Sequence, residues 1–279
     1  MKSQRTIKGA LTIDGTGLQT GARTALTLKP SPPSTGINFI RVDMPNKPLV
    51  SVRSLDFGNR GTGFERRTTL GVGPLQIQTT EHLMAALSGL SIDNIIVELD
   101  GAELPGLDGS AKGFVEAIKR CGITEQDAPR KFLELKEAVW CEGKDNFIAA
   151  FPGENFRVSY TMSYKAAILG TQLLDIVLNE KNFENEIAPA RTFCLEEEAL
   201  QLLAMGLGKG ANYENTLVMG KSGPVNNTLR FPDEPVRHKV LDLIGDLYLA
   251  GMPLKAHVVA IKSGHALNLE LVKRLKNSC

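Results

Sequence analysis

The chain has 279 residues, of which 42% are hydrophobic and 23% are charged, and its 32 basic residues nearly balance 31 acidic ones. This composition is typical of a globular protein with a real core, and the length fits one large domain or two ordinary ones. The balanced charge argues against a nucleic-acid partner, and neither a membrane-spanning run nor a signal peptide is recognisable, so a cytoplasmic protein is expected.

The first part of the chain alternates apolar and polar residues. The stretch "RTIKGALTIDGTGLQTGARTALTLKP" is bounded by Gly and Pro, which predicts antiparallel strands. In "QTTEHLMAALSGLSIDNIIVELDG", Thr79 or Thr80 is expected to cap a helix, and "NIIVELD" is expected to form a strand.

A second helix and a polar stretch follow. "GLDGSAKGFVEAIKRCG" predicts a turn, a serine or aspartate cap, and a helix that ends at Gly122. "ITEQDAPRKF" is polar and contains Pro129, so it is interpreted as a linker between domains.

The second half repeats the order of strands followed by helices. "KFLELKEAVWCEGKDNFIAAFPG" and "NFRVSYTMSY" predict strands, and "ARTFCLEEEALQLLAMGLGKG" predicts a strand end and a helix closed by Gly206. A long helix has Pro235 in its first turn, and "AHVVAIKSGHALNLELVKRLKN" predicts a strand, a turn and a last helix. The repeated order predicts an α+β fold of two similar domains from a duplication, residues 1–126 and 127–279.

The cysteines do not suggest a metal site. Cys121, Cys141, Cys194 and Cys279 are widely separated and form no C-x-x-C pair, so free thiols are expected. A metal would therefore need His, Asp or Glu ligands, and the chain has only four histidines.

Three ionisable residues recur every four positions in "EPVRHKVLDLIGDLYLAG". Because steps of four advance a helix by only about 40°, His238, Asp242 and Asp246 share one stripe. His and Asp one turn apart can both reach one cation. Taken alone, this motif is more often an exposed polar stripe.

Two other histidines extend the hypothesis. In "TTEHLMAAL", His82 could be a third ligand and Glu81 a base, although an isolated Glu-His pair is common. In "KSGHALN", His265 could be a general acid held by Asp246, or equally a helix-capping histidine. His257 lies within a predicted strand and is interpreted as non-catalytic.

Together these segments resemble a known enzyme family. "TIDGTGLQTG", "TTEHLMAALSGLSIDNIIVELDG", "LPGLDGSAKGFVEAI", "ARTFC", "LRFPDEPVRHKVLDLIGDLYLAG" and "KSGHALN" occur in the order typical of the zinc-dependent UDP-3-O-acyl-N-acetylglucosamine deacetylases of lipid A biosynthesis. The resemblance covers almost the whole chain.

The resemblance implies a role for each matching residue, in an active site between two α+β domains that each layer a sheet against helices. The implied metal ligands are His82, His238 and Asp242. The implied catalytic residues are the base Glu81, His265 with its partner Asp246, and Thr192 at the oxyanion; the implied substrate contacts are Lys239, Phe193 and Gln19. The implied cofactor is Zn²⁺, although His/His/Asp ligation also accepts Fe²⁺.

The implied reaction removes the N-acetyl group of UDP-3-O-((R)-3-hydroxyacyl)-N-acetylglucosamine and releases a free amine and acetate. The only implied partner is this small molecule with its fatty acyl chain, and we expect a monomer without stable membrane insertion. An insertion near residues 194–217 is implied to wrap the acyl chain. Leu200, Leu203 and Met205 either line it or are ordinary core residues.

Two departures leave alternatives open. Gln19 stands where the family usually has histidine, and glutamine can hydrogen-bond but cannot become cationic. "GKGANYEN" replaces a commoner Gly-Gly-Ser pattern, which allows a different acyl-chain preference. The alternative is therefore a non-catalytic or altered-specificity relative that binds a related N-acetylated sugar nucleotide.

Overall fold

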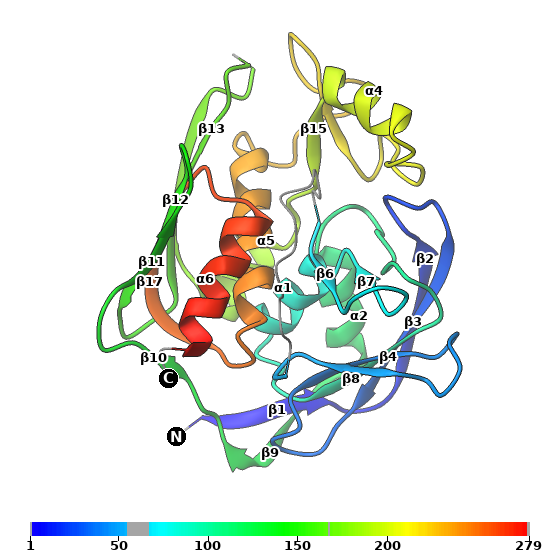
Figure 1. The fold of residues 1–279 in the computed structure, drawn as a ribbon, viewed down its shortest axis with the longest axis vertical. Helices are drawn as coiled ribbons and strands as arrows, with labels where there is room; N and C mark the ends of the chain where they lie inside the picture. Colours follow the sequence, from blue (N-terminus) through cyan, green and yellow to red (C-terminus); the bar gives the residue numbers. More distant parts are fainter. Residues whose placement is uncertain (1, 55–66, 167, 278–279) are drawn as a thin grey trace.

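Two β-sheets flank a central group of helices in the computed structural model, which describes residues 2–54, 67–166 and 168–277 (Figure 1). The fold mixes sheets and helices, as the predicted α+β class requires. None of the described helices is both long and apolar enough to span a membrane.

The first sheet comes from the N-terminal half and has the strand order β2-β3-β8-β4-β5. Its strands are β2 (Leu11–Thr16), β3 (Arg23–Pro30), β8 (Ile95–Leu99), β4 (Ile37–Arg41) and β5 (Leu49–Ser51). In β3, buried and more exposed residues alternate, because successive side chains of a strand point to opposite faces. The helices of this half are α1 (Glu81–Gly89) and α2 (Lys112–Cys121), and a short hairpin joins β6 (Thr69–Leu70) to β7 (Ile77–Gln78).

The second sheet has the order β11-β12-β17-β13-β14, with β10 (Leu133–Glu134) also paired to β17. Its other strands are β11 (Val139–Glu142), β12 (Phe147–Pro152), β17 (Leu254–Ile261), β13 (Arg157–Ser163) and β14 (Thr171–Val177). In each sheet the middle strand, β8 or β17, is antiparallel to one neighbour and parallel to the other. The two halves therefore share a strand order and a pattern of directions.

The helices of the second half lie between the sheets and at one edge. They are α3 (Glu180–Asn182), a π-helical turn at Phe183–Ile187, α4 (Glu196–Ala204), α5 (Glu234–Tyr248) and α6 (His265–Asn277). A small unit in which β15 (Phe193–Leu195) pairs in parallel with β16 (Leu217–Met219) carries α4. This unit stands apart from both sheets, at the upper right of Figure 1.

The predicted linker at residues 123–132 is wrong as a description of local structure. Ile123–Pro129 forms strand β9, which pairs antiparallel with β1 (Ser3–Ile7). The sequence pattern did not indicate this strand because its inward residues are partly polar. Gln126 accepts a hydrogen bond from Asn94 Nδ2 and donates one to the carbonyl of Ser31. Pro129 ends the strand, where a missing N–H is tolerated.

The predicted helix caps are half right. Thr80 occupies the N-cap position of α1, but its side chain makes no capping hydrogen bond. Thr79 is also not a cap, because its hydroxyl donates to Glu103 instead. In α2 the N-cap position belongs to Ala111, and the predicted serine, Ser110, lies one residue earlier, where its Oγ accepts from the backbone N–H of Lys112 at 3.1 Å.

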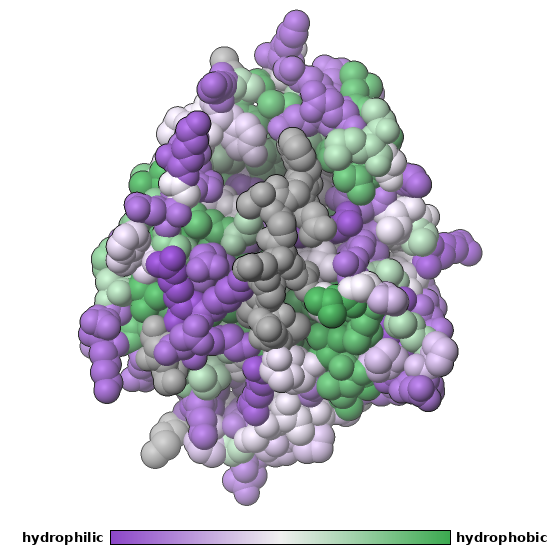
Figure 2. All heavy atoms as spheres, in the orientation of Figure 1, coloured by the Kyte–Doolittle hydropathy of each residue, from purple (hydrophilic) through white to green (hydrophobic). Residues whose placement is uncertain are grey.

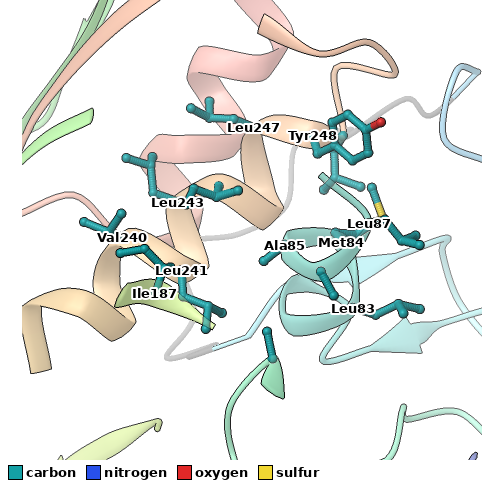
Figure 3. Packing of buried hydrophobic residues seen from close by; sticks show 14 of the residues in the cluster. Leu83, Met84, Ala85, Leu87, Ile187, Val240, Leu241, Leu243, Leu247 and Tyr248 are labelled. Carbon is teal, nitrogen blue, oxygen red and sulfur yellow. The ribbon is translucent and has the colours of Figure 1, made fainter. Parts of the chain in front are cut away.

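The core brings α1 and α5 into direct contact. Figure 3 shows buried apolar side chains packed around both helices, with Ala85 of α1 on the side that faces α5 and Leu241. The closest approach is at Gly245 of α5, where an added Cβ would lie 2.1 Å from the carbonyl oxygen of Glu81. A glycine is needed here because any side chain would push the helices apart.

We therefore expect Gly245→Ala to destabilise the protein by about 2 kcal/mol, as overpacking of a close-packed interior does. Urea unfolding would measure the loss. Gly9→Ala is the matched control, since a Cβ at Gly9 would meet nothing within 4 Å. Equal stability of the two variants would show that the contact between α1 and α5 is not rigid.

Candidate active site

Three buried side chains from α1 and α5 form a candidate metal site. Among the described residues, His82, His238 and Asp242 are the group whose potential ligand atoms all lie within 4.8 Å of one another. His238 Nε2 lies 3.3 Å from Asp242 Oδ1, and His82 Nε2 lies 3.9 Å from the same oxygen. Contact between α1 and α5 thus places the lone ligand of one helix beside the i, i+4 pair of the other.

The charge states of these groups suit a metal. Burial lowers the pKa of both histidines, that of His82 to about 3, so both imidazoles are neutral. His238 Nδ1 donates to the carbonyl of Ala190 at 3.1 Å, which leaves its Nε2 free to face the site. Burial alone would raise the pKa of Asp242, but the nearby positive charges of Lys239 and His265 oppose burial, and that pKa is lowered, so the carboxylate is ionised.

Two imidazole nitrogens and one carboxylate oxygen are the ligand set that catalytic zinc sites use, with a further position left open. Lys239 Nζ donates to Asp242 Oδ2 at 2.6 Å, so Oδ1 remains directed at the two histidines. The residues present therefore fit a divalent cation of the zinc type.

Glu81 begins α1 next to the candidate ligand His82 and is buried. Its Oε2 accepts from the backbone N–H of Thr68 at 3.0 Å. Burial raises the pKa of Glu81 to about 7, although the nearby His265 opposes the shift. A carboxyl with such a pKa can take and return a proton near neutral pH.

His265 faces Glu81 and the candidate ligands from the first residue of α6. Its Nδ1 donates to Asp246 Oδ2 at 2.8 Å, and its Nε2 lies 3.8 Å from Asp242 Oδ2. Burial alone would lower its pKa, but Asp246 and Asp242 outweigh burial and raise it to about 9. His265 is therefore cationic at neutral pH.

Sequence reasoning missed two residues that hold this pair. Thr68 Oγ1 donates to the fully buried Asp246, and Asn268 Nδ2 donates to Asp246 Oδ2 at 2.8 Å. Asn268 follows His265 by three residues on α6, so the "HALN" motif contained a signal for it. Nothing near Thr68 in the sequence marks it, because its contacts lie far away along the chain.

These groups open into a groove of about 510 Å³. Of the predicted site residues, all but the buried Asp246 line this groove: Gln19, Glu81, His82, Thr192, Phe193, His238, Lys239, Asp242 and His265. The structure therefore brings the whole predicted set together. His257 lies elsewhere, on β17, with its Nε2 2.8 Å from Ser159 Oγ.

The groove continues from the polar site towards α4. Leu200 and Leu203 of this helix line the groove and are also largely exposed. Figure 2 shows apolar surface over α4 at the upper right of the molecule. Met205, the third proposed lining residue, is exposed and does not line the groove, since it follows the last turn of the helix.

Thr192 and Phe193 lie on the wall between the polar site and α4. The backbone N–H of Thr192 donates to the carbonyl of Gly109 at 2.8 Å, and Thr192 itself lines the groove. The Phe193 ring is edge-on to both His238 and Tyr164, with centroid distances of 6.3 Å and 5.9 Å. Phe193 thereby closes the apolar side of the candidate metal site.

Gln19 faces the groove from the other half of the chain. Its Oε1 accepts from the N–H of Gly208 at 3.2 Å, so the side chain is already bonded across the groove. The cysteines take no part in the candidate metal group: Cys121, Cys141 and Cys194 form no disulfide among the described residues, and Cys279 lies outside them.

Known proteins were compared with this chain. The family model described as UDP-3-O-acyl N-acetylglycosamine deacetylase matches residues 4–277. Three proteins named UDP-3-O-acyl-N-acetylglucosamine deacetylase are similar to this chain over most of its length and of their own. The one from Myxococcus xanthus is 41% identical, with 98% of this chain and 86% of the relative covered. The one from Chlamydia pneumoniae is 42% identical, with 98% and 97% covered, and the one from Bdellovibrio bacteriovorus is 37% identical, with 99% and 90% covered.

Proposed function

Since this chain belongs to the UDP-3-O-acyl N-acetylglycosamine deacetylase family, we propose that it hydrolyses the N-acetyl group of UDP-3-O-((R)-3-hydroxyacyl)-N-acetylglucosamine in a zinc-dependent reaction of lipid A biosynthesis. The products are the free 2-amine and acetate. The observation that carries the proposal is the joining of three buried potential ligands, a carboxyl and a cationic histidine in one groove that runs on to α4.

The groove offers a place for each part of such a substrate. The acetamide lies at the polar end, near His82, His238 and Asp242, which would hold the Zn²⁺. The acyl chain extends past Phe193 towards Leu200 and Leu203, on the insertion at residues 194–217. Apolar side chains there can bury the chain without an unsatisfied polar group.

A bound Zn²⁺ would supply Lewis-acid polarisation of the acetamide carbonyl. Glu81 takes the proton of the attacking water, since its carboxyl is buried beside the open position and has a pKa near neutrality. The hydroxyl of Thr192 and the imidazolium of His265 donate hydrogen bonds to the oxyanion. Asp246 keeps His265 cationic and orients its Nε2 towards the groove.

The leaving amine needs a proton, and both Glu81 and His265 can supply it from within the same groove. Lys239 neutralises part of the charge of Asp242 and lies on the groove wall, where it can also contact the sugar nucleotide. Gln19 is proposed to contact the substrate as a neutral hydrogen-bonding group in place of a cation.

We expect kcat/KM to follow a bell-shaped pH profile, because kcat/KM reports the pKa values of the protein without substrate. Activity rises through about pH 7 as Glu81 loses its proton, and falls through about pH 9 as His265 loses its own. Steady-state acetate release between pH 5 and about 10.5 would measure both limbs. In His265→Gln the residual activity should lack the falling limb. A falling limb that persists unchanged would assign it to another group.

A non-catalytic binding module remains the competing hypothesis, and Gln19 is its only support. Acetate release from the acylated sugar nucleotide separates the two, and UDP-N-acetylglucosamine without the acyl chain is the comparison substrate. The proposal requires turnover of the acylated compound and little turnover of the other. Binding of both without turnover would favour the binding module, and turnover of a different amide would favour altered specificity.

The predicted duplication belongs to the same proposal, with halves at residues 1–126 and 127–279. The shared strand order of the two main sheets supports it, although residue 126 lies within β9. We also propose a cytoplasmic monomer with Zn²⁺ as its metal, with Fe²⁺ as an alternative that the same ligands accept. Sedimentation of the purified protein tests the monomer, and metal analysis tests the identity of the bound metal.

A further inference from the structure

We propose that Glu103 is a positioning residue for the reaction, because its carboxylate joins the loop that carries Gln19 to Thr79, which lies two residues before α1. The proposal rests on the proposed function for its kinetic consequences. The Gln19 loop is defined here as residues 17–21. Glu103 lies on neither α1 nor this loop, and it does not line the groove.

Glu103 is a buried carboxylate that accepts every hydrogen bond it makes to its four neighbouring groups. Its side chain is 3% exposed and accepts four hydrogen bonds. The donors are the backbone N–H groups of Gln19 and Thr20, both at 2.8 Å, and the hydroxyls of Thr20 at 2.7 Å and Thr79 at 2.9 Å. Because the two backbone groups can only donate, an ionised carboxylate matches the site and an amide does not.

On one side Glu103 controls the approach to α1. Thr79 has φ of +58°, a left-handed conformation that is costly for a β-branched residue. Its hydroxyl is held by Glu103, and a backbone bridge pairs Gln78 with Glu103. Two residues later comes Glu81, followed by His82, so the strained turn at Thr79 sets the direction in which both side chains leave the chain.

On the other side Glu103 supports the Gln19 loop. The loop packs so closely that a Cβ at Gly17 would lie 2.3 Å from Glu103 Oε2. From this support the loop reaches the insertion, where the N–H groups of Lys209 and Gly210 donate to the carbonyls of Gln19 and Leu18 at 3.2 Å and 3.1 Å. One carboxylate thus fixes the groove wall that meets the substrate and the turn that aims the base.

This arrangement predicts two separable kinetic effects. Loss of the Thr79 hydroxyl disturbs the aim of Glu81 and should lower kcat. Loss of the Thr20 hydroxyl loosens the Gln19 loop and should raise KM. Glu103→Gln replaces one carboxylate oxygen by an N–H₂ group, which faces the backbone N–H of Gln19 or of Thr20 in either orientation. It also removes the negative charge that strengthens the hydrogen bond from Thr79, so it should change both parameters.

The experiment measures kcat and KM for Thr79→Val, Thr20→Val and Glu103→Gln with the acylated sugar nucleotide. We expect kcat to fall about tenfold in Thr79→Val, and KM to rise about tenfold in Thr20→Val, as befits loss of one charge-assisted hydrogen bond. Glu103→Gln should lose about 100-fold in kcat/KM, since small misplacements of reacting groups have effects of that size. Glu98→Gln is the matched control. Glu98, on β8, is paired with Lys29 of β3 and does not line the groove, so the variant should match wild type.

Hydrogen exchange at the amides of Gln19 and Thr20 gives a readout independent of turnover. Both amides donate to Glu103, so they should exchange faster in Glu103→Gln while amides in the core of α5 do not. If wild-type protein releases no acetate, the proposed function fails, and the exchange result still decides whether Glu103 holds the loop.

Three outcomes would overturn the proposal. One is Glu103→Gln with kcat, KM and amide exchange all close to wild type. Another is a fall in kcat that only matches a loss of folded protein, with KM and exchange unchanged. If Glu103→Gln does not fold, the two threonine variants decide the matter, and a change in the same parameter in both would refute separate control of base and loop.

Discussion

Glu81→Gln is expected to lower kcat about 1,000-fold and to leave the metal content unchanged. The amide keeps the shape of the side chain, and its oxygen can still accept from the N–H of Thr68, so local structure should survive. It cannot accept the proton of the attacking water, and general base catalysis contributes about 10²–10⁴-fold. Acetate release and metal analysis of the same preparation measure both quantities.

Glu116→Gln is the control for this substitution. Glu116 carries the same carboxylate on α2, where it is exposed and paired with Lys112. That variant should match wild type in rate and metal content. A Glu81→Gln protein that keeps more than about a tenth of the wild-type kcat would show that another group is the base, because the loss would then lie below the usual range of general base catalysis.

His238→Ala is expected to abolish stoichiometric zinc binding and, with it, acetate release. It removes one of three buried potential ligands and also frees the carbonyl of Ala190 that now orients the ring. Loss of an orienting partner alone usually weakens metal binding by about 10–100-fold, so loss of the ligand itself should exceed about 100-fold. Competition with a chromophoric chelator would measure the affinity.

His257→Ala provides the matched histidine control, because His257, on β17, bonds to Ser159 of β13 and lies outside the groove. It should bind zinc and turn over substrate as wild type does. Zinc affinity that is equal in the two variants would place the metal somewhere other than at His82, His238 and Asp242.

The features of the site that could be predicted are those that depend on local geometry. His238, Asp242 and Asp246 share a stripe because a helix repeats every four residues with little rotation, and the structure keeps them on one helix, α5. The predicted contact between Asp246 and His265 is present at 2.8 Å. Membership of the family likewise follows from motifs spread along the whole chain.

The features that escaped prediction depend on contacts between distant segments. The strand at residues 123–129 exists because β1 pairs with it, while its own residues are mostly polar. No sequence motif marks Glu103, since its four hydrogen-bond donors come from segments more than twenty residues away. Thr68 holds Asp246 from 178 positions away, a separation over which no periodicity in the sequence carries information.

The similarity of the two halves could be predicted only in part. Strands followed by helices, twice, indicated two similar units, but only the paired strands show that both main sheets have the same order and directions. One close contact between the halves lies where Gly245 of α5 meets the carbonyl of Glu81. The packing of α1 on α5 brings Glu81 and His82 from one half to His238 and Asp242 from the other, and it could not be predicted without the packed structure.

The most direct test of the central claim is acetate release from UDP-3-O-acyl-N-acetylglucosamine before and after removal of the metal. We predict turnover by the purified protein, loss of turnover when a strong chelator has removed the metal, and recovery when stoichiometric Zn²⁺ is returned. Undiminished turnover by metal-free protein, or no turnover by protein with zinc bound at His82, His238 and Asp242, would contradict a zinc-dependent deacetylase.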